Sequence, residues 1–190
     1  MSSRGFPVVL SSPSGGGKTT VAAGLLAALP YLRKSRSTTT RQPRPGERPG
    51  VDYEFVTGEA FEQRKAAGAF AEWASVHGHG YGTSKVFVDE TCAAGLCPLL
   101  VIDVQGGRAV RRAYPDALLV FLMPPSLDEI GRRLRARASE PDARLEARLG
   151  NAPGEIAAGL EYDYIVMNAS LDLAIEQVRQ VLSRERETRS

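Results

Sequence analysis

A glycine-rich stretch near the N-terminus holds the residue types that bind phosphate groups. In SSPSGGGKTT, residues 11–20, three consecutive glycines allow the backbone to turn its N–H groups toward an anion, because glycine lacks the Cβ atom that disfavours positive φ. Lys18 follows them and can reach the β- and γ-phosphates of a nucleotide. The hydroxyl of Thr19 can ligate Mg²⁺. The stretch therefore predicts a phosphate-binding loop.

The local context supports this prediction, although the first position of the loop departs from the usual pattern. Ser12 stands where the pattern G-x-x-x-x-G-K-[ST] has its first glycine, so a chance glycine-rich turn is the alternative. An apolar run, residues 7–10, precedes the loop and predicts a strand. An alanine- and leucine-rich stretch, residues 19–29, predicts a helix that Pro30 ends. A strand, a glycine loop and a helix in this order are what a phosphate-binding loop requires.

A carboxylate follows a second buried strand. Residues 99–104, LLVIDV, form an apolar run that is typical of a buried parallel strand and ends its apolar part at Asp103. Ligands of open α/β sheets bind at the carboxyl ends of the strands. Asp103 is therefore predicted to help hold a metal ion, directly or through water. The alternative is an aspartate that only caps a strand end or a helix start.

A second group of phosphate-binding residue types lies in residues 37–56, STTTRQPRPGERPGVDYEFV. Arg41 and Arg44 lie three residues apart, and Tyr53 lies on the next predicted strand. Guanidinium groups match phosphate oxygens in a bidentate way, and a tyrosine hydroxyl adds a further donor. The segment predicts a phosphate site separate from the glycine loop, with a solvated basic turn as the alternative.

The order of predicted elements indicates an α/β fold. Buried strands alternate with helices in residues 1–36 and 84–190, which predicts a three-layer core with a parallel sheet covered on both faces. Residues 37–83 contain short strands, turns and one short helix, and are assigned to an inserted lobe. Further elements are expected as helices at 58–67, 84–94, 107–114, from Ser126 and at 171–182, and as strands at 70–76, 118–123 and 164–167.

Composition excludes several classes of protein. A net charge of +2 over 190 residues gives no field that would mark a nucleic-acid or membrane binder. Cys92 and Cys97 are the only cysteines, which argues against a disulfide framework. The N-terminus lacks the apolar core of a secretory signal, and no apolar run approaches the length of a membrane span. We expect a cytoplasmic protein that binds neither nucleic acid nor membranes; the oligomeric state stays open.

Five motifs together resemble the guanylate kinase family. They occur in order and at suitable spacing from about Val8 to the final helix, and they are SSPSGGGKTT, TTTRQPRPGE with GVDYEFV, EWASVHGHGYGTS, VIDVQG and EYDYIVMN. The resemblance implies a P-loop kinase core with a GMP-binding lobe and a mobile helical lid at about residues 126–155. It also implies phosphoryl transfer from ATP, with Mg²⁺, to GMP and also to dGMP.

The resemblance assigns residues to both substrates. Those implied around GMP are Ser37, Arg41, Arg44, Tyr53, Glu72, Tyr81 and Thr83. Those implied around ATP are Ser14, Gly15, Gly16, Gly17, Lys18, Thr19, Thr20 and Asn168, with Thr19 and Asp103 near the metal. Catalytic positive charge is implied for Lys18, Arg41, Arg133, Arg137 and Arg148. No general base is needed, because the acceptor is already an anionic phosphate oxygen.

The chemistry of Glu72 agrees with a guanine site. Guanine presents N1–H and its N2 amino group as adjacent donors, and a carboxylate offers two acceptors that match them. Adenine has an acceptor at N1, so the same carboxylate would be left unpaired. The alternative for Glu72 is a strand carboxylate on the surface.

The sequence departs from the family pattern at several positions. Ser12 replaces a glycine, Val101 stands where an acidic residue is usual, and Ala138 replaces a glycine that follows the lid arginine. Two further functions therefore stay open. One is an inactive guanylate-kinase-like module that binds a phosphorylated protein through Arg41, Arg44 and Tyr53. The other is a P-loop kinase for a different small phosphorylated substrate.

Overall fold

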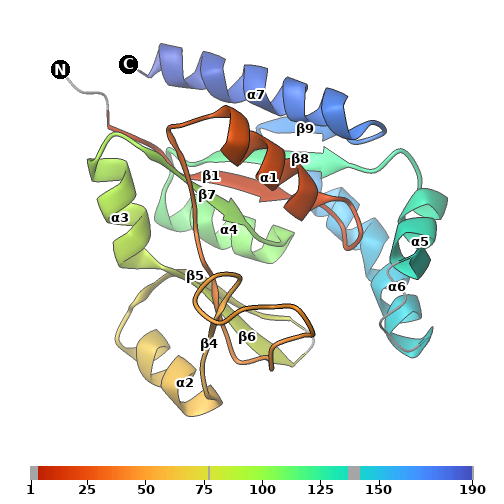
Figure 1. The fold of residues 1–190 in the computed structure, drawn as a ribbon, viewed down its shortest axis with the longest axis horizontal. Coiled ribbons are helices and arrows are strands. Elements are labelled where there is room, and N and C mark those ends of the chain that lie inside the picture. The colour runs from red at the N-terminus through yellow and green to blue at the C-terminus, as the bar shows by residue number, and fades with distance from the viewer. Residues whose placement is uncertain (1–3, 77, 137–141, 190) are drawn as a thin grey trace.

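The computed structural model describes residues 4–76, 78–136 and 142–189 and contains two separate sheets (Figure 1). The larger sheet has five parallel strands in the order β2-β7-β1-β8-β9. These strands are β1 (Val8–Ser11), β2 (Leu32–Lys34), β7 (Cys97–Val101), β8 (Leu118–Met123) and β9 (Tyr164–Met167). The central position of β1, between β7 and β8, places the glycine loop in the middle of the carboxyl edge.

Helices cover both faces of this sheet. Helices α1 (Lys18–Ala28) and α7 (Leu171–Thr188) bury one face through a core that includes Val21, Leu25, Val178 and Leu182. Helices α3 (Lys85–Ala93) and α4 (Val104–Ala113) bury the other face, where Val9, Leu100 and Phe121 are fully enclosed. The predicted three-layer α/β core is therefore confirmed.

The second sheet has four strands in the order β4-β3-β6-β5 and lies below the core in Figure 1. Its strands are β3 (Thr38–Thr39), β4 (Glu54–Phe55), β5 (Phe70–Val76) and β6 (His79–Ser84), and α2 (Gly58–Ala66) packs against β5. The antiparallel pair of β5 and β6 aligns Glu72 with Thr83. We call this sheet and α2 the lobe.

Two strands are shorter than their sequence patterns predicted. VDYEFV, residues 51–56, contributes only Glu54–Phe55, because the N–H groups of Val51 and Asp52 donate to the carbonyl oxygen of Arg48 within a turn. The run LLVIDV leaves the sheet after Val101, and α4 begins at Val104, three residues before the predicted 107. Asp103 causes the early start, because its carboxylate caps α4.

Two further helices lie at the right of Figure 1, beside the carboxyl edge of the large sheet. They are α5 (Leu127–Ala136) and α6 (Asp142–Gly159), and they pack through Ile130, Leu149 and Ala152. The Ser126 hydroxyl accepts from the Glu129 N–H and so caps the start of α5, the helix that the sequence predicted from Ser126. None of the helices in the described part of the chain is long and apolar enough to span a membrane.

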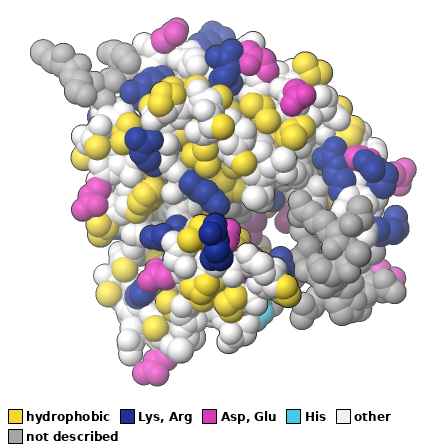
Figure 2. Space-filling model, viewed as in Figure 1, with side chains coloured by type: hydrophobic (Ala, Val, Ile, Leu, Met, Phe, Trp, Pro, Cys, Tyr) yellow, Lys and Arg dark blue, Asp and Glu magenta, His cyan; other side chains and the backbone are white. Residues whose placement is uncertain are grey.

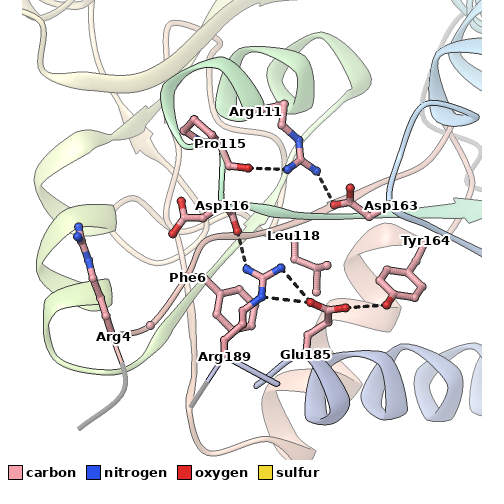
Figure 3. Close-up of a pocket in the computed structure, with 11 residues that line it drawn as sticks. Arg4, Phe6, Arg111, Pro115, Asp116, Leu118, Asp163, Tyr164, Glu185 and Arg189 are labelled. Atoms are coloured by element: carbon pink, nitrogen blue, oxygen red, sulfur yellow. Dashed lines mark hydrogen bonds and ion pairs between the residues drawn. The ribbon is translucent and has the colours of Figure 1, made fainter. Parts of the chain in front are cut away.

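Side chains at the end of α7 contact residues at the amino edge of the sheet (Figure 3). The Arg189 guanidinium contacts the Glu185 carboxylate at 2.9 Å and the carbonyl oxygen of Asp116 at 2.6 Å, and lies 4.2 Å from the ring centroid of Phe6. Glu185 also accepts from the Tyr164 hydroxyl at 2.6 Å, and its pKa is held below the usual range by that hydroxyl and by Arg189. These groups line a pocket of about 700 Å³ at the edge opposite the glycine loop.

Replacing Arg189 by alanine should lower the stability of the fold, because it removes the carboxylate contact, the carbonyl bond and the ring contact together. We expect a loss of about 0.5–1.5 kcal/mol, which corresponds to a fall in Tm of roughly 1–6 °C for a chain of this size. Thermal unfolding followed by circular dichroism measures it. The exposed Arg112→Ala on α4 is the control, and an equal fall in both variants would contradict the assignment.

Candidate functional site

The glycine loop joins the end of β1 to the start of α1 and turns through two left-handed residues. Gly15 has φ 81° and Gly17 has φ 89°, values that side chains with a Cβ rarely adopt. The N–H groups of Thr20 and Val21 donate to the carbonyl oxygen of Gly17, which starts α1 directly at the loop. The N-terminus of α1 therefore directs its first N–H groups and the positive end of its dipole toward the loop.

Ser12, the departure from the usual glycine, lies inside this loop and is 1% exposed. The Lys18 ammonium donates to the Ser12 carbonyl oxygen at 2.6 Å and lies 3.2 Å from its hydroxyl. A Cβ atom at Gly16 would come within 2.4 Å of that hydroxyl oxygen, so the serine fills space that Gly16 leaves free. The substitution therefore fits the loop and holds its lysine, which the sequence pattern did not reveal.

Asn168 supports the loop from beneath. It follows β9, is 3% exposed, and its side-chain amide donates to the carbonyl oxygen of Gly16 at 2.7 Å. Its backbone N–H donates to the carbonyl oxygen of Met123 at the end of β8. Its own carbonyl oxygen accepts from the guanidinium group of Arg133 of α5 at 3.1 Å. A Cβ atom at Gly17 would lie 2.6 Å from the amide nitrogen, so glycine is required there for a second reason. The amide thus contacts the loop backbone.

A buried hydroxyl pair links the end of α6 to the strand that precedes the loop. The Tyr162 hydroxyl donates to Ser11 Oγ at 2.8 Å, and Ser11 Oγ donates to the carbonyl oxygen of Ile102 at 2.9 Å. Burial raises the pKa of Tyr162 to about 12, with the Ser11 bond opposing the rise and the charge of Asp103 adding to it. Gly107 makes room, because a Cβ atom there would lie 1.9 Å from the hydroxyl. Sequence reasoning missed this pair.

Asp103 lies next to this pair and caps α4. Its carboxylate accepts from the Gly106 N–H at 2.8 Å, which is the capping role that the sequence left as the alternative. The capping bond is accepted by Oδ1 of Asp103. The residue lies at the carboxyl edge of the sheet, as predicted. Thr19 is exposed in the first turn of α1. Within the described residues, no three His, Cys, Asp or Glu side chains gather closely enough to hold a metal by themselves.

Glu72 is a buried carboxylate on the lobe strand β5. It is 6% exposed, and the Thr83 hydroxyl donates to its Oε1 at 2.6 Å. A Cβ atom at Gly106 would lie 3.0 Å from Oε2, so the carboxylate faces the start of α4. Burial raises the pKa of Glu72 to about 7; the Thr83 bond opposes this rise and the charge of Asp103 adds to it. The surface carboxylate, which the sequence left as the alternative for Glu72, is therefore wrong.

The basic turn of the lobe forms an organised cluster. Arg41 donates to the Tyr81 hydroxyl at 3.2 Å and lies 5.2 Å from the ring centroid of Tyr53. Its two terminal nitrogens contact both oxygens of Glu47 at 2.8 and 2.9 Å, and the Arg44 N–H donates to the same carboxylate. Arg41 holds the pKa of Glu47 below its usual range despite partial burial. Glu47, which sequence reasoning did not single out, therefore orients the arginine.

Other predicted residues lie in less constrained places. Ser37 is half-buried beside β3, and its carbonyl oxygen accepts from the backbone N–H of Glu54. Arg133 contacts Glu129 at 2.7 Å as well as Asn168. Arg137 and Ala138 lie outside the described residues, and so does the side chain of Arg148. The Ser14 N–H donates to Glu155 of α6 at 3.2 Å, so the helical part reaches the loop.

The glycine loop and the cluster around Arg41 lie on either side of an opening. Figure 2 shows a hollow to the right of the lobe and below the core, with lysine and arginine side chains gathered between core and lobe. The loop lies at the core edge, and the cluster with Arg41, Tyr53 and Tyr81 lies in the lobe. The arrangement offers two separate anion sites with a buried carboxylate between the lobe and α4.

Comparisons with known proteins give one consistent result. A family model described as guanylate kinase matches residues 4–185. A guanylate kinase from Symbiobacterium thermophilum is 44% identical over 183 residues, 96% of this chain and 87% of that protein. One from Anaeromyxobacter dehalogenans is 49% identical over 184 residues, 96% of this chain and 81% of that protein. The crystal structure of guanylate kinase from Anaplasma phagocytophilum matches with a TM-score of 0.81 and 34% identity, covering 97% of this chain and 87% of that one.

Replacing Glu72 by glutamine should stabilise the fold at neutral and higher pH. The pKa of Glu72 in the folded chain, about 7, lies above the ordinary 4.5, so its contribution to stability is complete below pH 4.5 and is lost as pH rises through 7. We expect the variant to gain on the order of 1–3 kcal/mol relative to the parent between pH 5 and pH 8. Urea unfolding at both pH values measures the gain. Glu62→Gln, on an exposed side chain, is the control, and a pH-independent difference for Glu72→Gln would contradict the burial argument.

Proposed function

The chain belongs to the guanylate kinase family, and we propose that it transfers the γ-phosphoryl group of ATP to GMP, giving ADP and GDP. The resemblance predicted from the five motifs is thereby confirmed at the level of the family. The observation that carries the proposed activity is the buried pair of Glu72 and Thr83, because a desolvated carboxylate held by a hydroxyl offers two acceptors that match the adjacent donors of guanine.

We assign guanine recognition to this pair. The free energy of burying a carboxylate is recovered when its oxygens accept from N1–H and the N2 amino group of guanine. The Thr83 hydroxyl holds Oε1 and so orients the carboxylate before the base arrives. We place Ser37 beside O6 of the base; its hydroxyl can donate there. Adenine would leave the carboxylate unpaired, which disfavours AMP strongly.

The GMP phosphate is assigned to the lobe cluster. Arg41 is oriented by Glu47 and Tyr81 before substrate binds, which lowers the entropy lost on binding. Tyr53 and Arg44 complete the proposed set, with the Tyr53 ring packed near Tyr81. This organisation argues against the solvated basic turn that the sequence left open.

The ATP phosphates are assigned to the glycine loop. Backbone N–H groups of residues 14–20 and the N-terminus of α1 would bind the phosphate oxygens, with Lys18 between the β- and γ-phosphates. The oxygen donors Thr19 and Asp103 fit a Mg²⁺ ion that is completed by phosphate and water oxygens. When bound, that ion neutralises charge on the phosphates. We assign Asn168 to holding the loop that binds ATP.

Catalysis is proposed to rest on position and positive charge. Arg133, Arg137 and Arg148 of the helical part, which we assign to a lid at about residues 126–155, would contact the transferring group together with Lys18 and Arg41. These charges stabilise the equatorial oxygens of a loose transition state, and the anionic acceptor needs no general base. We assign residues 37–83 to the GMP-binding lobe and residues 1–36 and 84–190 to the core. A cytoplasmic location, activity on dGMP and absence of nucleic-acid binding stay predictions.

A substrate panel tests the proposed activity. ADP release is measured with ATP and one of GMP, dGMP, AMP, UMP or dTMP, and it should be fastest with GMP. Glu72→Gln should raise the KM for GMP by at least about tenfold, because the amide of glutamine places a donor opposite the donors of guanine. Thr91→Ser, which lies away from the site on α3, is the control. No activity on GMP with retained ATP binding would favour the phosphoprotein-binding module, and a preference for another monophosphate would favour the other kinase.

Tyr162→Phe should lower kcat roughly tenfold, because the loss of one buried hydrogen bond allows the strand before the loop to shift. The KM for GMP should stay unchanged, since the lobe contacts are untouched. Tyr164→Phe is the matched control: it removes a hydroxyl bonded to Glu185 at 2.6 Å at the opposite edge of the sheet. Both variants should lose similar stability, so an equal loss of kcat in both would show that Tyr162 only stabilises the fold.

A further inference from the structure

The two edges of the large sheet are built differently. The edge strand β2 carries Arg33 and Lys34, both exposed, and charged side chains on an edge discourage pairing with another chain. The edge strand β9 consists of Tyr164, Ile165, Val166 and Met167, with no charge and no proline. An uncharged edge leaves its outward N–H and C=O groups available to a further strand. Only one edge of this sheet is therefore protected by charge.

Strand β9 also exposes apolar side chains beside a groove. Ile165 is 46% and Met167 is 50% exposed, whereas Val166, which points to the opposite face, is 5% exposed and packs in the core under α7. A groove of about 560 Å³ runs along the strand and is lined on the α7 side by Gln177, Gln180, Val181 and Arg184. The groove thus has as its floor the edge strand β9, which pairs with β8 on its other side, and has α7 as its wall.

We propose that a second copy of this chain pairs antiparallel with β9, so that the two sheets become one continuous sheet about a twofold axis. A twofold axis brings identical groups near one another, so groups close to it must tolerate their own copies. Ile165 and Met167 tolerate their own copies because apolar side chains pack against one another. The side-chain amides of Gln177 and Gln180 tolerate theirs because an amide is both donor and acceptor. A phosphoprotein or basic peptide would need charges that this groove lacks in its middle.

The charges of α7 lie where such a dimer needs them. Arg184 lies at the Tyr164 end of the groove, and Asp172 lies in the first turn of α7, just after the Met167 end. Asp172 and Arg184 are twelve positions apart, which separates them by about 18 Å along the helix, so they do not pair within one chain. Antiparallel pairing brings Arg184 of one copy near Asp172 of the other at both ends of the interface. The helix is therefore complementary to itself.

Sedimentation velocity and light scattering over about 1–500 µM test the proposal, a range chosen because a four-residue strand gives a small and weak interface. The mass should rise from the 20.5 kDa of one chain toward twice that value. Ile165→Lys should remain a monomer, whereas Val86→Lys, on the exposed face of α3, should associate like the parent. A monomeric parent at every concentration, or association of Ile165→Lys equal to the parent, would overturn the proposal.

Charge reversal tests the arrangement without altering the strand. Arg184→Glu should weaken the dimer about fivefold to tenfold, because two like-charged contacts replace two ion pairs. Combining it with Asp172→Arg should restore the affinity, since the pairs re-form with exchanged signs. Circular dichroism checks that each variant is folded. A double variant as weak as Arg184→Glu, or a dimer indifferent to Arg184→Glu, would rule out the antiparallel pairing.

Discussion

The hydrogen bond from the Asn168 amide to the carbonyl oxygen of Gly16 is the contact on which the arrangement of the site depends. A loop of three glycines loses much conformational entropy when it is ordered, and its own side chains cannot offset that loss. Asn168 joins the loop to β8 through Met123 and to α5 through Arg133. The sheet, the loop and the helical part therefore meet at one buried residue.

Recognition and stability oppose each other at Glu72. The carboxylate is buried beside Asp103, and both its burial and that neighbouring charge disfavour its ionised form. Burial removes the water molecules that would donate to the carboxylate. The proposed partner, guanine, would supply two donors in their place. Arg41 shows the opposite arrangement, since Glu47 compensates its charge within the free protein. Glu72 is thus a buried charge without a countercharge among the described residues before guanine binds, whereas the charge of Arg41 is already paired with Glu47.

The proposed dimer surface is adjacent to the residue that contacts the phosphate loop. Strand β9 ends at Met167, and the next residue is the asparagine that holds Gly16. Pairing along β9 would restrict the strand from which Asn168 extends, and it would leave the opening between core and lobe free. The protected edge at β2 lies instead at the start of the segment that leads into the lobe. A partner there would lie near a part of the chain that substrate binding needs.

Local patterns determined much of this protein. The runs at 118–123 and 164–167 are the observed β8 and β9, and the predicted glycine loop and helices appear with boundary shifts of a few residues. Pairing across the lobe then brought Arg41 to Tyr81 and Glu72 to Thr83, as the family motifs implied. Tertiary structure alone decided how Ser12 holds Lys18, why Glu47 orients Arg41, and that Tyr162 reaches Ser11 across 151 residues. Such contacts depend on which side chains a folded chain buries together, and a serine, a glutamate or a tyrosine has no local periodicity that reveals its distant partner.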